Sequence, residues 1–190
     1  MADTTSTDRQ QRIESIAAAA IPVFAAQGYR GTSMADIAAA AGMSRPALYQ
    51  YFDNRSDLFR IAFGSLLEAN TDAALAALDH PGDLVDQLDG YLQRLTGDGY
   101  AQLAATPHGA ELMDAKHDVA ADVGTSAFAR AHAGLRTSLA KRNTSPDRIA
   151  AAVDLLVLSP LGLKSDYPAP TVYRTRLTAL ARAAVALLDD

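Results

Sequence analysis

Apolar side chains recur at every third or fourth position over most of the chain, which is the spacing of an α-helix with one buried face. The pattern is clearest in residues 83–96, where Asp83, Asp86 and Asp89 lie opposite the apolar face. That apolar face consists of Leu84, Leu88, Tyr91, Leu92 and Leu95. No stretch shows the alternation that is typical of a half-buried β-strand. The pattern therefore predicts an all-α protein.

Turn-forming and helix-capping residues divide this pattern into separate helices. We expect a kink at Pro22, where proline removes a backbone hydrogen bond, a break at residues 97–99, and a junction near residues 124–126. Residues 1–8 are rich in threonine and aspartate and are expected to form a disordered tail. The predicted helices span about residues 9–27, 32–41, 54–77, 83–96, 100–105, 108–123, 126–143, 146–163 and 171–188, with a very short helix that starts at residue 44 or 45.

Two short helices near the N-terminus are joined by a glycine turn. Gly42 can adopt the positive φ that ends a helix, and Ser44 is a favoured N-cap for the next one. Pro46 is tolerated only in a first helical turn, so the second helix has little freedom to start elsewhere. This order predicts a helix-turn-helix, whose second helix enters a DNA major groove. An ordinary helical hairpin in a core is the alternative.

The flanking residues favour the helix-turn-helix. The matched segments are Phe24–Ser33, Ile37–Ala38, Ala41–Ser44, Leu48–Phe52 and Asn54–Leu58. In this order they resemble the N-terminal domain of the tetracycline-repressor (TetR) family, over about residues 9–60. The resemblance implies a three-helix DNA-binding domain at residues 9–53, followed by a helical ligand-binding and dimerisation domain at residues 54–190. It also implies a dimeric, ligand-responsive transcriptional regulator, usually a repressor, which binds a palindromic DNA operator and is released by a small-molecule effector.

The recognition helix should carry side chains for bases and others for phosphates. Arg45 can pair with guanine, Gln50 can pair with adenine, and Ala47 can pack on a thymine methyl group. For the two tyrosines of this helix, contact with phosphate and partial packing in the core both stay open. Arg55 is placed like the phosphate-binding lysine of the family. The predicted DNA contacts are Thr32, Ser33, Ser44, Arg45, Pro46, Ala47, Tyr49, Gln50, Tyr51 and Arg55.

Four polar residues, Asn70, Tyr91, Lys116 and His132, interrupt otherwise apolar faces in the rest of the chain. A mostly apolar cavity with a few polar groups is typical of a small-molecule site. Each of the four could instead be a satisfied core group, or, for the lysine, an apolar stem whose amine reaches solvent. The predicted lining is Phe63, Leu66, Asn70, Tyr91, Leu95, Met113, Lys116, Phe128, His132 and Leu156. A ligand there would tilt the helix at residues 54–77, which begins beside the DNA-binding domain.

The helix at residues 146–163 is apolar on nearly every side, and such a helix needs partners on every side. A chain of 190 residues can hardly supply them all. We therefore expect a homodimer that forms through residues 146–163 and 171–188.

Charge and composition limit the alternatives. The net charge is −5, but six arginines and four acids leave +2 over residues 9–60, so any affinity for DNA would come from a local patch. The chain has no cysteine, which excludes a disulfide framework and thiolate chemistry. No stretch is long and apolar enough for a membrane span, and no signal peptide is seen, so a soluble, cytoplasmic protein is expected.

A helical-bundle enzyme, or a small-molecule carrier that binds no DNA, is the other class of function. Its candidate groups are His108, Glu111, Asp114, His117, Asp118 and His132. A metal site from Asp114, His117 and Asp118 is conceivable, but a solvated helix face is the favoured interpretation. No nucleophile motif, phosphate loop or zinc pattern is present. We therefore predict no catalytic residue, no metal ligand and no cofactor.

Overall fold

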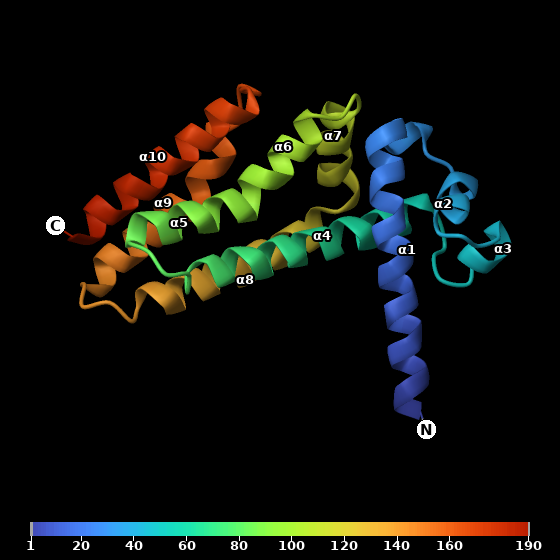
Figure 1. Cartoon of the computed structure of the whole chain (residues 1–190), viewed down its shortest axis with the longest axis horizontal. Coiled ribbons are helices and arrows are strands. Elements are labelled where there is room, and N and C mark those ends of the chain that lie inside the picture. Colours follow the sequence, from blue (N-terminus) through green and yellow to red (C-terminus); the bar gives the residue numbers. More distant parts are fainter. Residues whose placement is uncertain (1, 190) are drawn as a thin grey trace. The chain divides into compact units, whose positions relative to one another are not determined.

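The computed structural model describes residues 2–189, except for the side chains of residues 2–6, 116 and 117. Within this range the chain is helical and contains no strand, as the hydrophobic pattern predicts (Figure 1). The elements are α1 (Ala2–Gly31), α2 (Met34–Ala40), α3 (Arg45–Leu48), α4 (Arg55–Ala77), α5 (Leu84–Leu92), the π-helix η1 (Gln93–Gly97), α6 (Asp98–Ala104), α7 (Gly109–Val119), α8 (Ala121–Leu139), α9 (Pro146–Leu163) and α10 (Pro170–Asp189).

The helices form two compact units. The head unit comprises Met1–Leu67 and Ala105–Gly124, and the body unit comprises Glu68–Ala104 and Thr125–Asp190. The head therefore contains α7 and the first half of α4 in addition to the helix-turn-helix. This division does not fall at residue 54, because α7 packs against α1 although it is distant from it in sequence.

The head unit has its own apolar core, formed from α1, α2, α3 and the start of α4. Its buried side chains are Ile16, Ala17, Ala20, Phe24, Met34, Ile37, Ala38, Leu48, Phe52, Leu58, Phe59 and Ala62. Phe59 packs edge-on against Phe24 and Tyr29, with ring centroids 5.0 and 5.1 Å apart. These contacts hold α4 against α1 and thereby fix the positions of α2 and α3, which connect these two helices in the sequence.

Helix α1 differs from the prediction in where it begins and in where its backbone departs from helical angles. It begins at Ala2 instead of residue 9, so the segment expected to be a tail is helical from that residue onward. The residue inside α1 with non-helical backbone angles is Gly28 (φ 76°, ψ 169°), and not Pro22. Pro22 is exposed, so water can satisfy the carbonyl that its ring leaves without a hydrogen bond. The expected kink therefore lies six residues later, at a glycine.

Two of the helix breaks that the sequence predicts are absent from the structure. Residues 97–99 do not end a helix, because α5 passes through η1 directly into α6. Gly97 is buried, and a Cβ there would lie 2.6 Å from Gln93 Oε1 and 3.2 Å from Leu177 Cδ1. This glycine therefore permits close packing against α10. Residues 124–126 are also helical, since α7 ends at Val119 and α8 starts at Ala121.

Helix α10 packs against both α9 and α5 in the body unit. Its Tyr173 is fully buried, donates a hydrogen bond to the Pro160 carbonyl (3.2 Å) and shares another with the Thr96 hydroxyl (3.0 Å). Leu88 and Leu156 are also fully buried. The buried hydroxyls of Tyr173 and Thr96 thus have hydrogen-bond partners inside the mainly apolar core.

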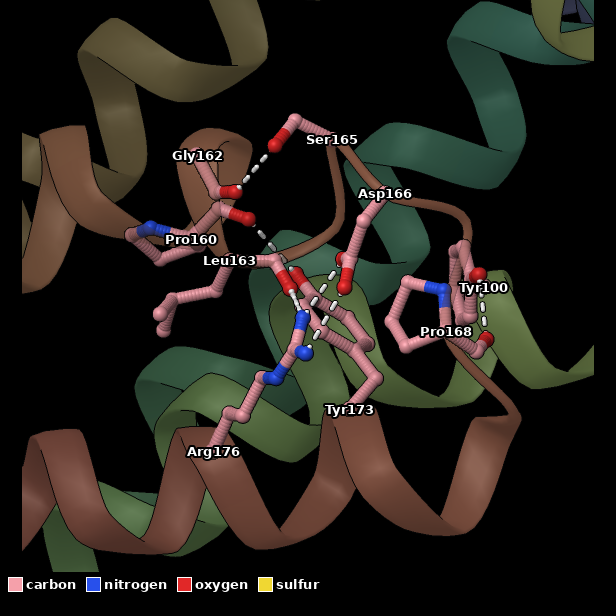
Figure 2. A network of polar contacts seen from close by, with 9 residues as sticks. All are labelled: Tyr100, Pro160, Gly162, Leu163, Ser165, Asp166, Pro168, Tyr173 and Arg176. Carbon is pink, nitrogen blue, oxygen red and sulfur yellow. Dashed lines mark hydrogen bonds and ion pairs between the residues drawn. The ribbon is translucent and has the colours of Figure 1, made fainter.

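The connection between α9 and α10 is held by side chains on both sides (Figure 2). Arg176 donates to the Leu163 carbonyl (2.6 Å) and to both carboxylate oxygens of Asp166 (2.6 and 2.8 Å). These hydrogen bonds from Arg176 lower the pKa of the Asp166 carboxyl. The Tyr100 hydroxyl donates to the Pro168 carbonyl at 2.7 Å. The loop is therefore well braced, although Tyr167 within it is exposed.

Candidate nucleic-acid interface

Helix α2 starts at a reciprocal cap between Ser33 and Asp36. The Ser33 hydroxyl accepts from the Asp36 amide (3.2 Å), and the Asp36 carboxylate accepts from the Ser33 amide (3.0 Å) and hydroxyl (2.6 Å). The hydrogen bonds from Ser33 lower the pKa of Asp36. Such a capping box fixes the first turn of the helix. Ser33 is exposed, but its hydroxyl proton is directed at Asp36.

Thr32 is buried, whereas the sequence predicts that it contacts DNA. Its side chain is 1 % exposed, and its hydroxyl donates to the Gly28 carbonyl at 2.7 Å. A buried hydroxyl with this partner cannot reach a phosphate, so the expected side-chain contact of Thr32 is corrected to a structural one. Sequence reasoning treated both hydroxyl residues as equal candidates because either could cap α2.

The turn between α2 and α3 has the glycine conformation and the helix cap that the sequence predicts. Gly42 has φ +64°, and no atom lies within 4 Å of a Cβ built on it, so only its backbone conformation requires glycine. Ser44 caps α3 by accepting from the Ala47 amide at 3.3 Å, and Pro46 lies in the first turn. Leu48 and Phe52 are buried. The two short helices are therefore fixed by caps at their ends and by apolar residues underneath.

The outer face of α3 carries the side chains that can read DNA. Arg45, Pro46 and Gln50 are exposed, and Tyr49 is 43 % exposed. The Arg45 guanidinium lies over the Tyr49 ring, 5.6 Å from its centroid, and is 3.4 Å from its hydroxyl. Ser44 is exposed and Ala47 is half-buried. The exposed guanidinium of Arg45 and the exposed amide of Gln50, which follows α3, carry donors and an acceptor of the kind that pair with base edges.

The second tyrosine of this segment is more enclosed than the first. Tyr51 is half-buried, and the Arg9 guanidinium of α1 lies 5.8 Å from its ring centroid. Such an arrangement supplies a modest cation–π attraction between α1 and the segment after α3. Tyr51 therefore combines the two alternatives that the sequence left open, since it packs partly against the head while part of it stays accessible.

Arg55 has a structural role that the sequence did not reveal. Its Nη1 donates to the Arg30 carbonyl (2.9 Å) and to the Thr32 carbonyl (3.0 Å), and its guanidinium lies 4.5 Å from the Tyr29 ring centroid. These contacts join the start of α4 to the loop before α2. A hollow of about 440 Å³ lies at this place, lined by residues 29–34 and 54–56.

We expect Arg55→Ala to lower the free energy of unfolding of the head by about 1–2 kcal/mol, since one exposed and one partly buried carbonyl lose a charged donor. Arg55→Lys keeps the positive charge but cannot bond both carbonyls in the same geometry, so it should also destabilise. Thermal unfolding measures both changes. If Arg55→Ala leaves thermal stability unchanged and alters only the affinity for DNA, the phosphate role predicted from the sequence would replace the structural one.

Residues 16–61 match the model of the bacterial regulatory proteins of the tetR family, and this segment contains α2, the Gly42 turn, α3 and the start of α4. The helix-turn-helix segment is therefore similar to that of the TetR family. The proteins of that family, and the solved structures that the chain resembles, are transcriptional regulators.

Two curated relatives are helix-turn-helix transcriptional regulators. An uncharacterised helix-turn-helix regulator, YezE of Bacillus subtilis (strain 168), is 36 % identical over 69 residues, which are 36 % of each chain. AcrR of Shigella flexneri is 41 % identical over 59 residues, which are 31 % of this chain and 27 % of AcrR. These matches thus cover about a third of each relative. A TetR-family regulator from Mesorhizobium loti shares the fold, with a TM-score of 0.68, 21 % identity and coverage of 94 % and 96 % of the two chains.

The residues predicted to line an effector pocket are distributed over both units. Phe63, Leu66 and Met113 belong to the head unit, and the others that the structure describes belong to the body unit. Phe128 is 43 % exposed. Lys116 lies outside the residues whose side chains are described. The body residues Tyr91, Leu95 and Leu156 are buried, and Asn70 and His132 are half-buried.

Three buried polar atoms in the body unit have no hydrogen-bond partner among the described residues. They are Thr71 Oγ1 on α4, Tyr91 Oη on α5 and His132 Nε2 on α8. Burial raises the pKa of the Tyr91 hydroxyl, so it stays protonated as a donor at neutral pH. Sequence analysis missed Thr71, although its spacing from Ala74 and Leu78 places it on the buried face of α4.

Among the described residues, no group of three or more His, Cys, Asp or Glu side chains is arranged to hold a metal ion. Asp114 and Asp118 are exposed on α7, and the side chain of His117 lies outside the description. In the described part of the chain, no helix combines the length and apolarity that crossing a membrane requires.

Proposed function

We propose that the protein is a TetR-family repressor that binds a palindromic DNA operator as a homodimer and is released by a small-molecule effector. The observation that carries the proposal is the outer face of α3. There Arg45 is exposed, while Leu48 underneath is fully buried, and Gln50 is exposed just after the helix ends. A helix held by its inner face and capped at its start can present its outer face to the major groove without rearrangement.

The contacts that position the protein on the phosphate backbone would come from residues around α3. The hollow beside Arg55 is lined by the N-terminal ends of α2 and α4, and helix N-termini favour anions. Arg30 is exposed at its edge. Residues 9–60 carry a net charge of +2 in a chain whose net charge is −5, so two copies of this segment in a dimer would supply the attraction that a single copy lacks.

The exposed faces of α9 and α10 support the homodimer. Leu158 is 71 % exposed and Leu161 is 64 % exposed, whereas Val153 and Leu156 on the same helix are fully buried against the body core. Val172 on α10 is exposed as well. Large apolar side chains at this exposure are typical of a surface that is covered by a partner. A second copy of the chain is the partner that we propose.

The unpartnered atoms in the body support an effector site and suggest the chemistry of the effector. A buried hydroxyl without a partner costs free energy that a ligand can recover by hydrogen bonding to it. The threonine and tyrosine hydroxyls among them are neutral donors or acceptors, and most of the buried residues in the body are apolar. An apolar molecule with one or two uncharged polar groups would fit this combination.

Tyr91→Phe tests the effector site without knowledge of the effector. We expect the free protein to gain about 1 kcal/mol of stability, because an unpaired buried hydroxyl is removed. The variant should lose the thermal stabilisation that a screened ligand gives to the wild-type protein. Thermal unfolding with and without that ligand measures both effects. A clear loss of stability in the free variant would mean that the hydroxyl is already paired, and the site would lose its main support.

Helix α4 would carry the response between the two sites. It is one continuous helix that bears Arg55 at its start, in the head, and Thr71 in the body. A ligand that bonds Thr71 would displace this helix and change the separation of the two recognition helices in the dimer. Ligand and operator would then oppose each other with a reciprocal coupling of about 1–3 kcal/mol.

An electrophoretic mobility shift with the DNA upstream of the protein's own gene tests the proposed function. We expect a complex that survives competition by random DNA, weakens with rising salt, and dissociates when an effector is added. A protein that binds a small molecule tightly but shows no preference for any DNA would instead support the carrier alternative.

A further inference from the structure

The junction between α1 and α2, residues 28–33, has its backbone polar groups satisfied by side chains from elsewhere in the head unit. The Gly28 carbonyl accepts from the Thr32 hydroxyl, and the carbonyls of Arg30 and Thr32 accept from Arg55. Inside a helix these groups would bond to the next turn. The positive φ of Gly28 interrupts that ladder, so the junction depends on these substitute partners.

One of these partners comes from a distant helix. Glu111, in the first turn of α7, accepts from the Arg30 amide through Oε1 at 2.7 Å. Its other oxygen, Oε2, lies 3.5 Å from His108 Nδ1. The Glu111 side chain is 30 % exposed, so the carboxylate is partly screened from water. Amide hydrogen bonds to an ionised carboxylate are among the stronger ones in proteins.

Gly28 is fitted to this carboxylate. A Cβ at this position would lie 2.3 Å from Glu111 Oε2 and 3.0 Å from His108 Nδ1, which is closer than side-chain atoms approach one another. Gly28 is therefore required by its φ of +76°, and a side chain at this position would have to displace the Glu111 carboxylate. The junction and the start of α7 are thus shaped to fit each other.

We propose that Glu111 is a positioning residue for DNA recognition. Its carboxylate holds the Arg30 amide and thereby fixes the direction in which α2 and α3 leave α1. This proposal rests on the proposed function, since it assigns the orientation of the recognition helix to a contact with α7. Glu111 acts through the junction backbone, and its negative charge gives it no attraction for phosphate.

Two variants separate this role from simple stability or charge. Glu111→Ala removes both the acceptor and the charge, and Glu111→Gln removes the charge but keeps a carbonyl acceptor for the Arg30 amide. Asp122→Ala is the matched control, because Asp122 is also an exposed acid of the head unit but pairs with the Arg60 side chain and not with the junction. The probes are a duplex selected by the wild-type protein from a random library, and an unselected duplex.

Glu111→Ala should weaken binding to the selected duplex by about tenfold, as expected for the loss of a charged hydrogen bond. Binding to the unselected duplex should stay the same or become tighter, because it depends on charge and not on the direction of α3. Glu111→Gln and Asp122→Ala should keep the wild-type ratio between the two duplexes. Equal losses on both duplexes, or a Glu111→Gln variant as defective as Glu111→Ala, would overturn the proposal.

Hydrogen exchange of the Arg30 amide gives a readout that does not depend on DNA. Exchange should become faster in Glu111→Ala and stay close to the wild-type rate in Glu111→Gln. If the wild-type protein selects no duplex, the proposed function fails, and the exchange rates still decide the Glu111 contact. Unchanged exchange at Arg30 in Glu111→Ala would refute the contact even where DNA binding is intact.

Discussion

Leu158→Asp is expected to convert the dimer into monomers and to abolish sequence-specific DNA binding. Leu158 is 71 % exposed on α9, so an aspartate there is solvated in the single chain and should leave its fold intact. In the proposed dimer the same carboxylate would be buried among apolar side chains without a partner, which costs several kcal/mol. Each monomer would then contact only one half-site, with too few phosphates for a stable complex.

Sedimentation equilibrium at micromolar concentration, together with circular dichroism, measures this effect. Ala129→Asp is a suitable control, because Ala129 is exposed on α8, outside the proposed interface. The control should stay dimeric and bind DNA like the wild-type protein. A wild-type protein that sediments as a monomer, or a Leu158→Asp variant that stays dimeric, would show that α9 is not the interface.

Arg45→Ala and Gln50→Ala should each reduce the discrimination between operator and random DNA by about 1–3 kcal/mol, the usual worth of one good base pairing. Arg45 is exposed at the start of α3, Gln50 is exposed just after its end, and neither is among the buried residues of the head. Their removal should therefore leave the thermal stability of the head nearly unchanged. Competition titrations on operator and random duplexes measure the discrimination directly.

Arg45→Lys is the sharper variant of this experiment. Lysine keeps the positive charge and the attraction to phosphate, but it lacks the planar fork that pairs with two acceptors of guanine. Binding to random DNA should stay close to the wild-type level while the preference for the operator falls. Full discrimination in Arg45→Lys would show that this position contributes only charge, and the assignment of Arg45 to a base would have to be given up.

The local features of the head could be predicted from sequence because each depends on a few neighbouring residues. Ser44, Pro46 and Gly42 specify the start of α3 and the turn before it through capping, fixed φ and positive φ, and none of these needs a distant partner. The all-α architecture follows from the periodicity in the same way. Which exposed side chains contact bases stays a prediction.

The remaining features depend on residues that are far apart in the sequence. Gly97 resembles a helix breaker, but the packing of Leu177 against it makes it a site of close approach. Glu111 is 81 residues from the amide that it holds, and nothing near Arg30 indicates this partner. Arg55 was assigned to phosphate by its resemblance to a family position, whereas its hydrogen bonds to two carbonyls are visible only in the fold.

Selection of binding sites from a fully random duplex library tests the central claim most directly, because it presupposes no operator, gene or effector. The account predicts enrichment of an inverted repeat whose half-sites are centred about one helical turn, or a multiple of it, apart, since two identical recognition helices in a symmetric dimer impose that spacing. The same selection with Leu158→Asp should enrich no repeat. Enrichment of single, unpaired half-sites by the wild-type protein, or of no sequence at all, would contradict the account.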